Sequence, residues 1–191
     1  MSNIKTTITT VYGNTIDLLN IKEEDILLED ISLSLAQTRC YLGSNAPSYS
    51  IAQHSLNCSK VAREKYDERM GLYLLLHDAK SAYISNIESL KTIVTEVRLL
   101  EKNIEMAIYH HFGLEYPDFE LGYPNRLYME RIAEIDCGIL ANEIPSVMPQ
   151  FVGLIPKEML PYPMELDFRE HPVEDIKEEY EDTLNYLVKK I

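Results

Sequence analysis

The chain has 191 residues, of which 46% are hydrophobic, and it carries a formal net charge of -13 at pH 7. This length and this apolar share predict one domain with a substantial core. The acidic excess excludes broad binding to a nucleic acid polymer or to an anionic membrane surface, because both need a basic protein surface. A small anionic substrate remains compatible with it, since a pocket or a metal ion can reverse the charge locally.

The cysteines and the N-terminus indicate a soluble, cytoplasmic protein. Cys40, Cys58 and Cys137 form no CxxC pair, and their odd number is typical of reduced thiols that pack as small hydrophobes. The opening sequence MSNIKTTITT lacks the apolar centre of a signal peptide. No run of the sequence approaches the ~18 apolar residues that a membrane-spanning helix needs.

The first predicted element is a β-hairpin within residues 1–20, because residues 6–19 are rich in β-branched side chains around Gly13 and Asn14. From Leu28 onward the spacing of apolar residues becomes helical. Ser50 is a suitable N-cap for the second helix, and Gly113 is a suitable C-cap for the fourth. The predicted helices span residues 28–40, 50–65, 68–83, 93–112, 125–143 and 173–190.

Residues 148–172 contain five prolines and several apolar residues, which predicts an ordered arm over the surface or, alternatively, part of an interface. The predicted fold class is therefore all-α with a small N-terminal β-hairpin. We expect a single domain over residues 1–191. Its parts are the hairpin, a helical core over residues 28–143, and the arm with the C-terminal helix over residues 148–191.

Five histidines are the first candidates for chemistry, but each of them alone is a weak signal. His54 and His77 lie within predicted helices, where a histidine is more often packed or exposed than a ligand. His77 is followed by Asp78, directly after an apolar run. The pair His110 and His111 is typical of a helix end, and we do not expect a second metal site there.

Asp136 lies beside an apolar stripe of the predicted helix over residues 125–143. A carboxylate near a core is costly unless it is paired or binds a cation. The alternative partner is an arginine or the amides of a helix N-terminus. Two imidazoles and two carboxylates from three helices can hold one divalent ion, and such a mixed set favours Mn, Fe, Co, Ni or Mg over a closed structural Zn site.

Three segments together resemble the HD-domain metal-dependent phosphohydrolases: YSIAQHS (49–55), LLLHDAKSAYISNI (74–87) and AEIDCGILANE (133–143). The resemblance is to the compact branch with bacterial 5'-deoxynucleotidases, phage dATP triphosphohydrolases and many phage or prophage proteins, and it covers nearly the whole chain. It implies an HD-domain helical bundle that forms dimers or larger homo-oligomers in a bacterial or phage-infected cytoplasm. The implied cofactor is one divalent ion (Mn, Co, Fe, Ni, Mg or Zn) on His54, His77, Asp78 and Asp136.

The resemblance also implies a reaction, in which a metal-activated water attacks the phosphorus of a small (deoxy)nucleotide. Arg39, fifteen positions before His54, matches the family's phosphate-binding arginine, and its planar guanidinium suits a phosphate. The alternative is a surface arginine that a helix C-terminus favours. Cys40, Tyr41 and Leu42 would then line the sugar and base pocket, although family members often carry an aromatic residue where Cys40 stands.

The chain departs from the family after its His-Asp pair. The family's usual Glu is Ser81 here, and its usual Asp is Asn86. On a continuous helix, position 81 would share a face with His77, but a serine cannot act as a general acid or base near neutral pH. Lys80 either touches a substrate phosphate or is solvated. The alternative function is therefore a weakened or inactive HD protein that binds or sequesters a nucleotide.

Overall fold

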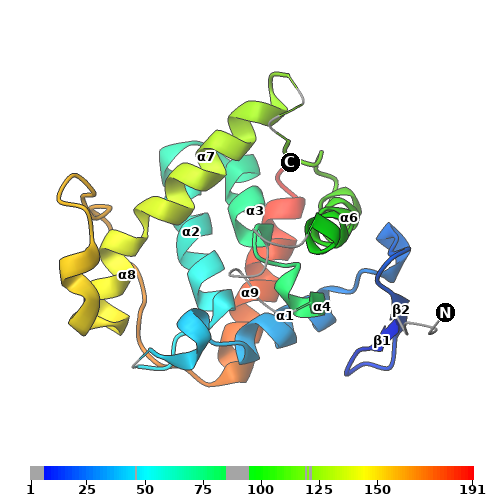
Figure 1. Ribbon diagram of the computed structural model, residues 1–191, viewed down its shortest axis with the longest axis horizontal. Helices are drawn as coiled ribbons and strands as arrows, with labels where there is room; N and C mark the ends of the chain where they lie inside the picture. The colour runs from blue at the N-terminus through cyan, green and yellow to red at the C-terminus, as the bar shows by residue number, and fades with distance from the viewer. Residues whose placement is uncertain (1–6, 46, 85–94, 119, 121) are drawn as a thin grey trace.

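The computed structural model describes residues 7–45, 47–84, 95–118, 120 and 122–191, and it has an all-α fold with one small hairpin (Figure 1). Strand β1 (Thr7–Thr9) pairs antiparallel with β2 (Thr15–Asp17), so the predicted hairpin is confirmed. Gly13 in the connecting turn has a φ of 89°, which a glycine adopts without steric cost. None of the helices in the described ranges is long and apolar enough to cross a membrane.

The helices follow the predicted order along the chain, with differences at several ends. The helices are α1 (Leu28–Gln37), α2 (Ile51–Lys65), α3 (Glu68–Leu76), α4 (Ser81–Ile84), α6 (Thr95–His111), α7 (Asn125–Gly138), α8 (Leu140–Val147) and α9 (Val173–Val188). Three short 3-10 turns are η1 (Glu23–Asp25), η2 (Cys40–Gly43) and η3 (Pro149–Leu154). Ser50 caps α2 by accepting a hydrogen bond from the Gln53 N–H at 3.2 Å, as the sequence predicts.

The main cluster of buried apolar side chains runs from Ile16 in β2 to Leu187 in α9. Helices α2 and α3 pack on each other, and α9 packs against both of them and against α1 (Figure 1). Tyr180 of α9 is fully buried in this core, where its hydroxyl donates to the Leu75 carbonyl at 2.7 Å. The core therefore fixes the C-terminal end of α3, which carries part of the candidate site.

The prediction of one helix over residues 68–83 is wrong, because α3 ends at Leu76 and α4 begins at Ser81. The last carbonyls of α3 accept bonds from elsewhere: Leu74 from Nδ1 of His77 at 2.7 Å, and Leu76 from the Ala79 N–H at 2.9 Å. Together with the Tyr180 bond, these contacts satisfy the helix end and favour a break there. His77 and Ser81 are therefore not on one continuous helix.

Two other predicted helix ends are also corrected. Helix α1 ends at Gln37 and not at residue 40, since Thr38 is extended and its hydroxyl bonds back to the Ser34 carbonyl at 2.8 Å. The helix predicted over residues 125–143 is divided in two: α7 stops at Gly138, and α8 continues through Pro145 to Val147. The Met148 N–H closes the last turn on the Ile144 carbonyl at 2.9 Å, so the proline does not end the helix.

The arm between α8 and α9 is held by two reciprocal amide contacts. Asn57 of α2 both donates to the Asp167 carbonyl at 2.8 Å and accepts from the Asp167 N–H at 3.1 Å. Asn142 of α8 makes the same pair of bonds with Tyr162, at 3.0 and 2.8 Å. The arm thus lies along α2 and α8, on the side of the molecule that bears the candidate site.

Candidate functional site

The four side chains that the sequence predicts as metal ligands meet where α2 lies against the end of α3 and the last turn of α7. Nε2 of His54 lies 3.3 Å from Nε2 of His77 and 3.2 Å from Oδ1 of Asp136. Nε2 of His77 lies 3.6 Å from Oδ1 of Asp136 and 3.6 Å from Oδ2 of Asp78. Two imidazole nitrogens and two carboxylates therefore surround one point.

The two imidazoles are oriented by bonds on their opposite nitrogens. Nδ1 of His54 lies 2.6 Å from Oε1 of Glu143, and Nδ1 of His77 lies 2.7 Å from the Leu74 carbonyl oxygen. A carboxylate or a carbonyl can only accept, so each Nδ1 carries the proton and Nε2 is left to act as a ligand. Such partners behind histidine ligands are typical of metal sites.

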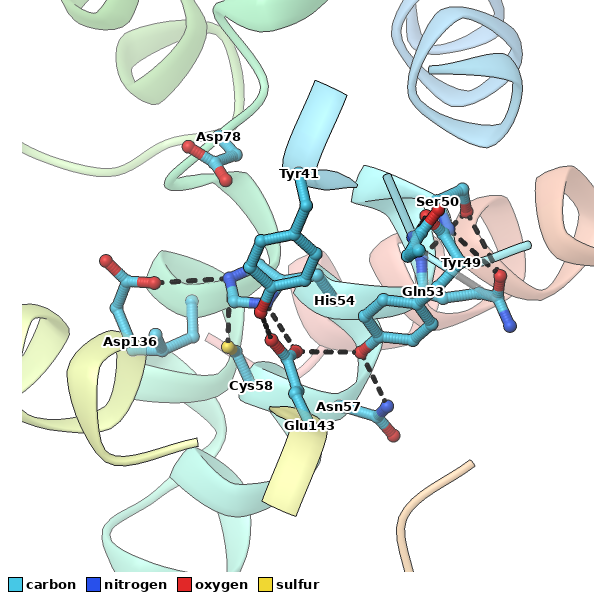
Figure 2. A network of polar contacts seen from close by, with 12 residues as sticks. Tyr41, Tyr49, Ser50, Gln53, His54, Asn57, Cys58, Asp78, Asp136 and Glu143 are labelled. Atoms are coloured by element: carbon cyan, nitrogen blue, oxygen red, sulfur yellow. Dashed lines mark hydrogen bonds and ion pairs between the residues drawn. The ribbon is translucent and has the colours of Figure 1, made fainter. Parts of the chain in front are cut away.

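Glu143, which the sequence patterns did not single out, is fully buried in the first turn of α8. Its carboxylate also accepts hydrogen bonds from the hydroxyls of Tyr49, at 2.9 Å, and Tyr41 (Figure 2). Burial alone would raise the pKa of Glu143, but the charge of His54 and the three hydrogen bonds lower it. The signal in the sequence was its place seven residues after Asp136, which puts both carboxylates on one side of the helix predicted over residues 125–143.

Cys58 is a second residue of the site that the sequence patterns did not single out. Its Sγ lies 3.5 Å from Nε2 of His54, one helical turn earlier on α2 (Figure 2). The donor atoms of His54, Cys58 and His77 all lie within 4.8 Å of one another, and this group could hold a metal ion. The four-residue spacing between His54 and Cys58 was the available signal, since it places both side chains on one face of a helix.

The electrostatics of the site favour positive charge at its centre. Burial alone would raise the pKa of Asp136, but its hydrogen bonds with His54 and His77 lower it well below the usual range. Burial alone would lower the pKa of His77, but Asp78 and Asp136 raise it. For His54, burial is likewise outweighed by the carboxylates of Glu143 and Asp136, which raise its pKa. The residues therefore fit a bound cation, because the anionic groups already attract protons to the place where it would lie.

The site has a buried side and a side open to solvent. The side chains of His54 and His77 are 9% and 7% exposed, and Cys58 is fully buried. The side chains of Asp78 and Asp136 are 19% and 46% exposed. A ligand from solution would therefore approach along the two aspartates, while the imidazoles and the thiol lie beneath it.

The segment with Arg39 is fixed beside α2 by backbone pairing. Arg39 forms a β-bridge with Ser50, and the Cys40 N–H donates to the Tyr49 carbonyl at 3.0 Å. The Arg39 side chain is exposed, and within the described part of the chain its guanidinium has no ion-pair partner. Arg39 is thus available to a solute, and it lies beyond the end of α1 and not within a helix.

Tyr41 and Leu42, predicted to line a base pocket, both have a φ of 53°. This left-handed conformation costs a residue other than glycine on the order of 1–3 kcal/mol, and such strain clusters at ligand sites. The Tyr41 hydroxyl is anchored on Glu143, whereas the side chain of Leu42 is almost wholly exposed. The strained turn therefore holds an apolar side chain in solvent next to a residue that is fixed to the site.

Lys80 and Ser81 are placed differently from the expectation. Lys80 is not solvated: its ammonium is largely buried, forms an ion pair with Glu105 and donates to the His77 carbonyl at 3.3 Å. Ser81 is buried, and its hydroxyl has no hydrogen-bond partner among the residues that the structure describes. Asn86, the third position of this group, lies outside the described residues.

Comparison with known proteins gives one partial match. No protein-family model matches the chain. A stretch of 95 residues is 30% identical to a protein of Escherichia coli (strain K12) named "Uncharacterized protein YfdR". The match covers 49% of this chain and 51% of that protein, so the chain spans about half the length of the curated relative that it matches. That name states no activity, and the likeness therefore brings none to this chain.

Proposed function

We propose that the chain is a metal-dependent phosphohydrolase that acts on small (deoxy)nucleotides. The observation that carries this proposal is the convergence of His54, His77, Asp78 and Asp136 from three helices on one point that is open to solvent on its carboxylate side. A divalent ion held there supplies a Lewis acid for a phosphoryl oxygen and lowers the pKa of a water molecule. The resemblance to the HD-domain phosphohydrolases points to the same chemistry.

In this proposal the chain's own residues bind and orient the substrate. The exposed guanidinium of Arg39 takes the phosphate, for which its planar fork is well shaped. Tyr41 and Leu42 contact the sugar or the base from the strained turn. The overall negative charge of -13 is then offset locally by Arg39 and by the bound cation.

A second candidate is a protein that binds a nucleotide without turning it over. It is favoured by the absence of a carboxylate at position 81 and by Lys80, whose charge is already neutralised by Glu105. A missing general acid or base typically costs about 10²–10⁴ in rate. The two candidates differ in one measurable quantity, the number of product molecules per protein molecule.

The experiment is a turnover assay on the full chain after chelation and reloading with Mn²⁺, Co²⁺, Mg²⁺ or Zn²⁺. A panel of nucleoside mono- and triphosphates is offered, and products are quantified by chromatography. His77→Ala removes a ligand, and His110→Ala, at the end of α6 on the surface, is the matched control. Multiple turnovers that are lost only in His77→Ala support the enzyme.

Two other outcomes decide against the enzyme. Stoichiometric binding of a nucleotide without product supports the binder. Unchanged metal content in His77→Ala contradicts the metal site itself, and with it both candidates.

A further inference from the structure

The buried side of the site contains a sulfur donor, the Cys58 thiol, in addition to the imidazole nitrogens and carboxylate oxygens. Cys58 is fully buried, and its Sγ lies 3.5 Å from Nε2 of His54. Both side chains leave the same face of α2, one turn apart. The thiol therefore points at the same nitrogen that faces His77 and Asp136.

Two separations among these donors match the edges of a tetrahedron around one ion. Zinc lies about 2.3 Å from sulfur and about 2.0–2.1 Å from nitrogen, so a tetrahedral site has S···N edges of about 3.5–3.6 Å and N···N edges of about 3.3–3.4 Å. The observed separations are 3.5 Å from Cys58 Sγ to His54 Nε2 and 3.3 Å between the Nε2 atoms of His54 and His77.

Asp136 lies at similar distances from the two imidazole nitrogens, and a magnesium site fits these separations less well. Oδ1 of Asp136 lies 3.2 Å from Nε2 of His54 and 3.6 Å from Nε2 of His77. An octahedral Mg²⁺ site with ligands at 2.0–2.1 Å would need edges of about 2.9 Å. The four separations, 3.2–3.6 Å, are therefore longer than the edges of an octahedral Mg²⁺ site and suit an ion that also accepts sulfur.

We propose that Cys58 coordinates the metal as a thiolate and that the site selects a thiophilic ion, Zn²⁺, Co²⁺ or Fe²⁺, over Mg²⁺ and Mn²⁺. The inference rests on the metal site of the proposed function and adds Cys58 to the donors on its buried side. On coordination the S–H bond breaks, the proton leaves to solvent, and the sulfur lone pair forms the bond to the metal. Because a thiolate is a soft ligand, the site then favours ions that bind both thiolate and imidazole.

Burial, partly opposed by His54, raises the pKa of the Cys58 thiol to about 11 and so disfavours a thiolate. A cation at bonding distance deprotonates a thiol outright, so the raised pKa of the buried thiol does not prevent coordination. The competing explanation is that Cys58 only fills the core as a small apolar side chain. In that case Cys58→Ser would change neither the absorption spectrum of the bound metal nor the metal preference.

The test uses the full chain loaded with Co²⁺, whose visible spectrum reports its geometry. A bound thiolate adds an intense charge-transfer absorption in the near ultraviolet. We expect this band in the unmodified chain and in Cys137→Ser, which alters an exposed thiol, and its loss in Cys58→Ser and Cys58→Ala. We also expect the preference for Zn²⁺ over Mn²⁺, measured by competition, to fall by about tenfold or more in both Cys58 variants.

The proposal can be overturned independently of any enzymatic activity. Bound Co²⁺ without a thiolate band in the unmodified chain overturns it, even if the variants fail to fold. A band and a metal preference that persist in folded Cys58→Ala overturn it as well. Absence of hydrolysis leaves the spectrum unaffected and counts only against the proposed enzyme, whereas absence of any Co²⁺ binding removes both proposals.

Discussion

Nδ1 of His54 lies 2.6 Å from Oε1 of Glu143, and that carboxylate is fully buried. A buried carboxylate costs several kcal/mol unless it is paired and hydrogen-bonded. Glu143 meets this condition through the imidazole and the hydroxyls of Tyr41 and Tyr49. The two residues therefore form one unit, in which the glutamate fixes the ring and increases the basicity of its free nitrogen.

Glu143→Gln tests this unit. The amide keeps the shape and can still accept from Nδ1 of His54, but it removes the charge. We expect the affinity for Zn²⁺ or Co²⁺ to fall about 10- to 100-fold, as is typical when a partner behind a metal ligand is changed. The measurement is competition with a chelator of known affinity. The control is Glu130→Gln, an exposed glutamate of α7 that pairs with Arg126; equal losses in both variants would refute the role of Glu143.

Arg39→Ala tests the phosphate contact. We expect nucleotide affinity to fall about 10- to 100-fold, because a hydrogen bond to a charged group contributes about 1.5–3 kcal/mol. Metal content should not change, since Arg39 is not among the ligands. Calorimetric titration of the metal-loaded chain with a nucleotide gives the affinity. Arg126→Ala, which removes an equal charge from the exposed face of α7, should bind the nucleotide normally. Equal affinity in both variants would show that Arg39 is a surface residue without a role in nucleotide binding.

Ser81→Ala tests whether the residue that replaces the family's glutamate takes part in catalysis. The Ser81 hydroxyl is buried without a partner among the described residues. Its removal should leave the free energy of unfolding unchanged or raise it by up to about 1 kcal/mol, because an unsatisfied buried group carries a desolvation cost. We expect turnover to stay within about twofold, because the Ser81 hydroxyl cannot act as a general acid or base near neutral pH. A loss of turnover in a stable variant would show a direct role for the hydroxyl.

Tyr180→Phe tests the end of α3. The variant keeps the ring in the core and removes only the hydroxyl that donates to the Leu75 carbonyl at 2.7 Å. We expect the free energy of unfolding to fall by about 1–3 kcal/mol, because a buried carbonyl at the helix end loses its donor. Chemical denaturation followed by circular dichroism measures it. Tyr186→Phe on the exposed side of α9 is the control and should change stability by less than about 0.5 kcal/mol.

Sequence patterns predicted the helices well where one side of a helix is apolar and the caps are local. The start of α2 is an example, because Ser50 and Gln53 act within one turn. They failed at the end of α3, because the residues from 74 to 83 are all compatible with a helix. The break there is favoured by Tyr180, more than a hundred residues later, and no local propensity contains that information.

The candidate site shows the same division between local and long-range information. His54, His77, Asp78 and Asp136 could be proposed because imidazoles and carboxylates are recognisable ligands, and a resemblance joined them. Cys58 and Glu143 were overlooked, since a buried thiol and a glutamate near a helix end have ordinary explanations in a sequence. The tertiary contact between α2 and α8 shows that Glu143 touches the His54 ring, and one turn of α2 brings Cys58 to the same ring.

The bond between Nδ1 of His77 and the Leu74 carbonyl has a consequence for the speed of ion capture. The imidazole serves as the cap of its own helix, so the orientation of the ring is set when the helix forms. A ring flip would expose a helix carbonyl and turn the wrong nitrogen toward the centre. The donor is thus pre-organised, and little conformational entropy is left to lose when an ion arrives. Uptake and exchange of the ion should consequently proceed without rearrangement of the backbone.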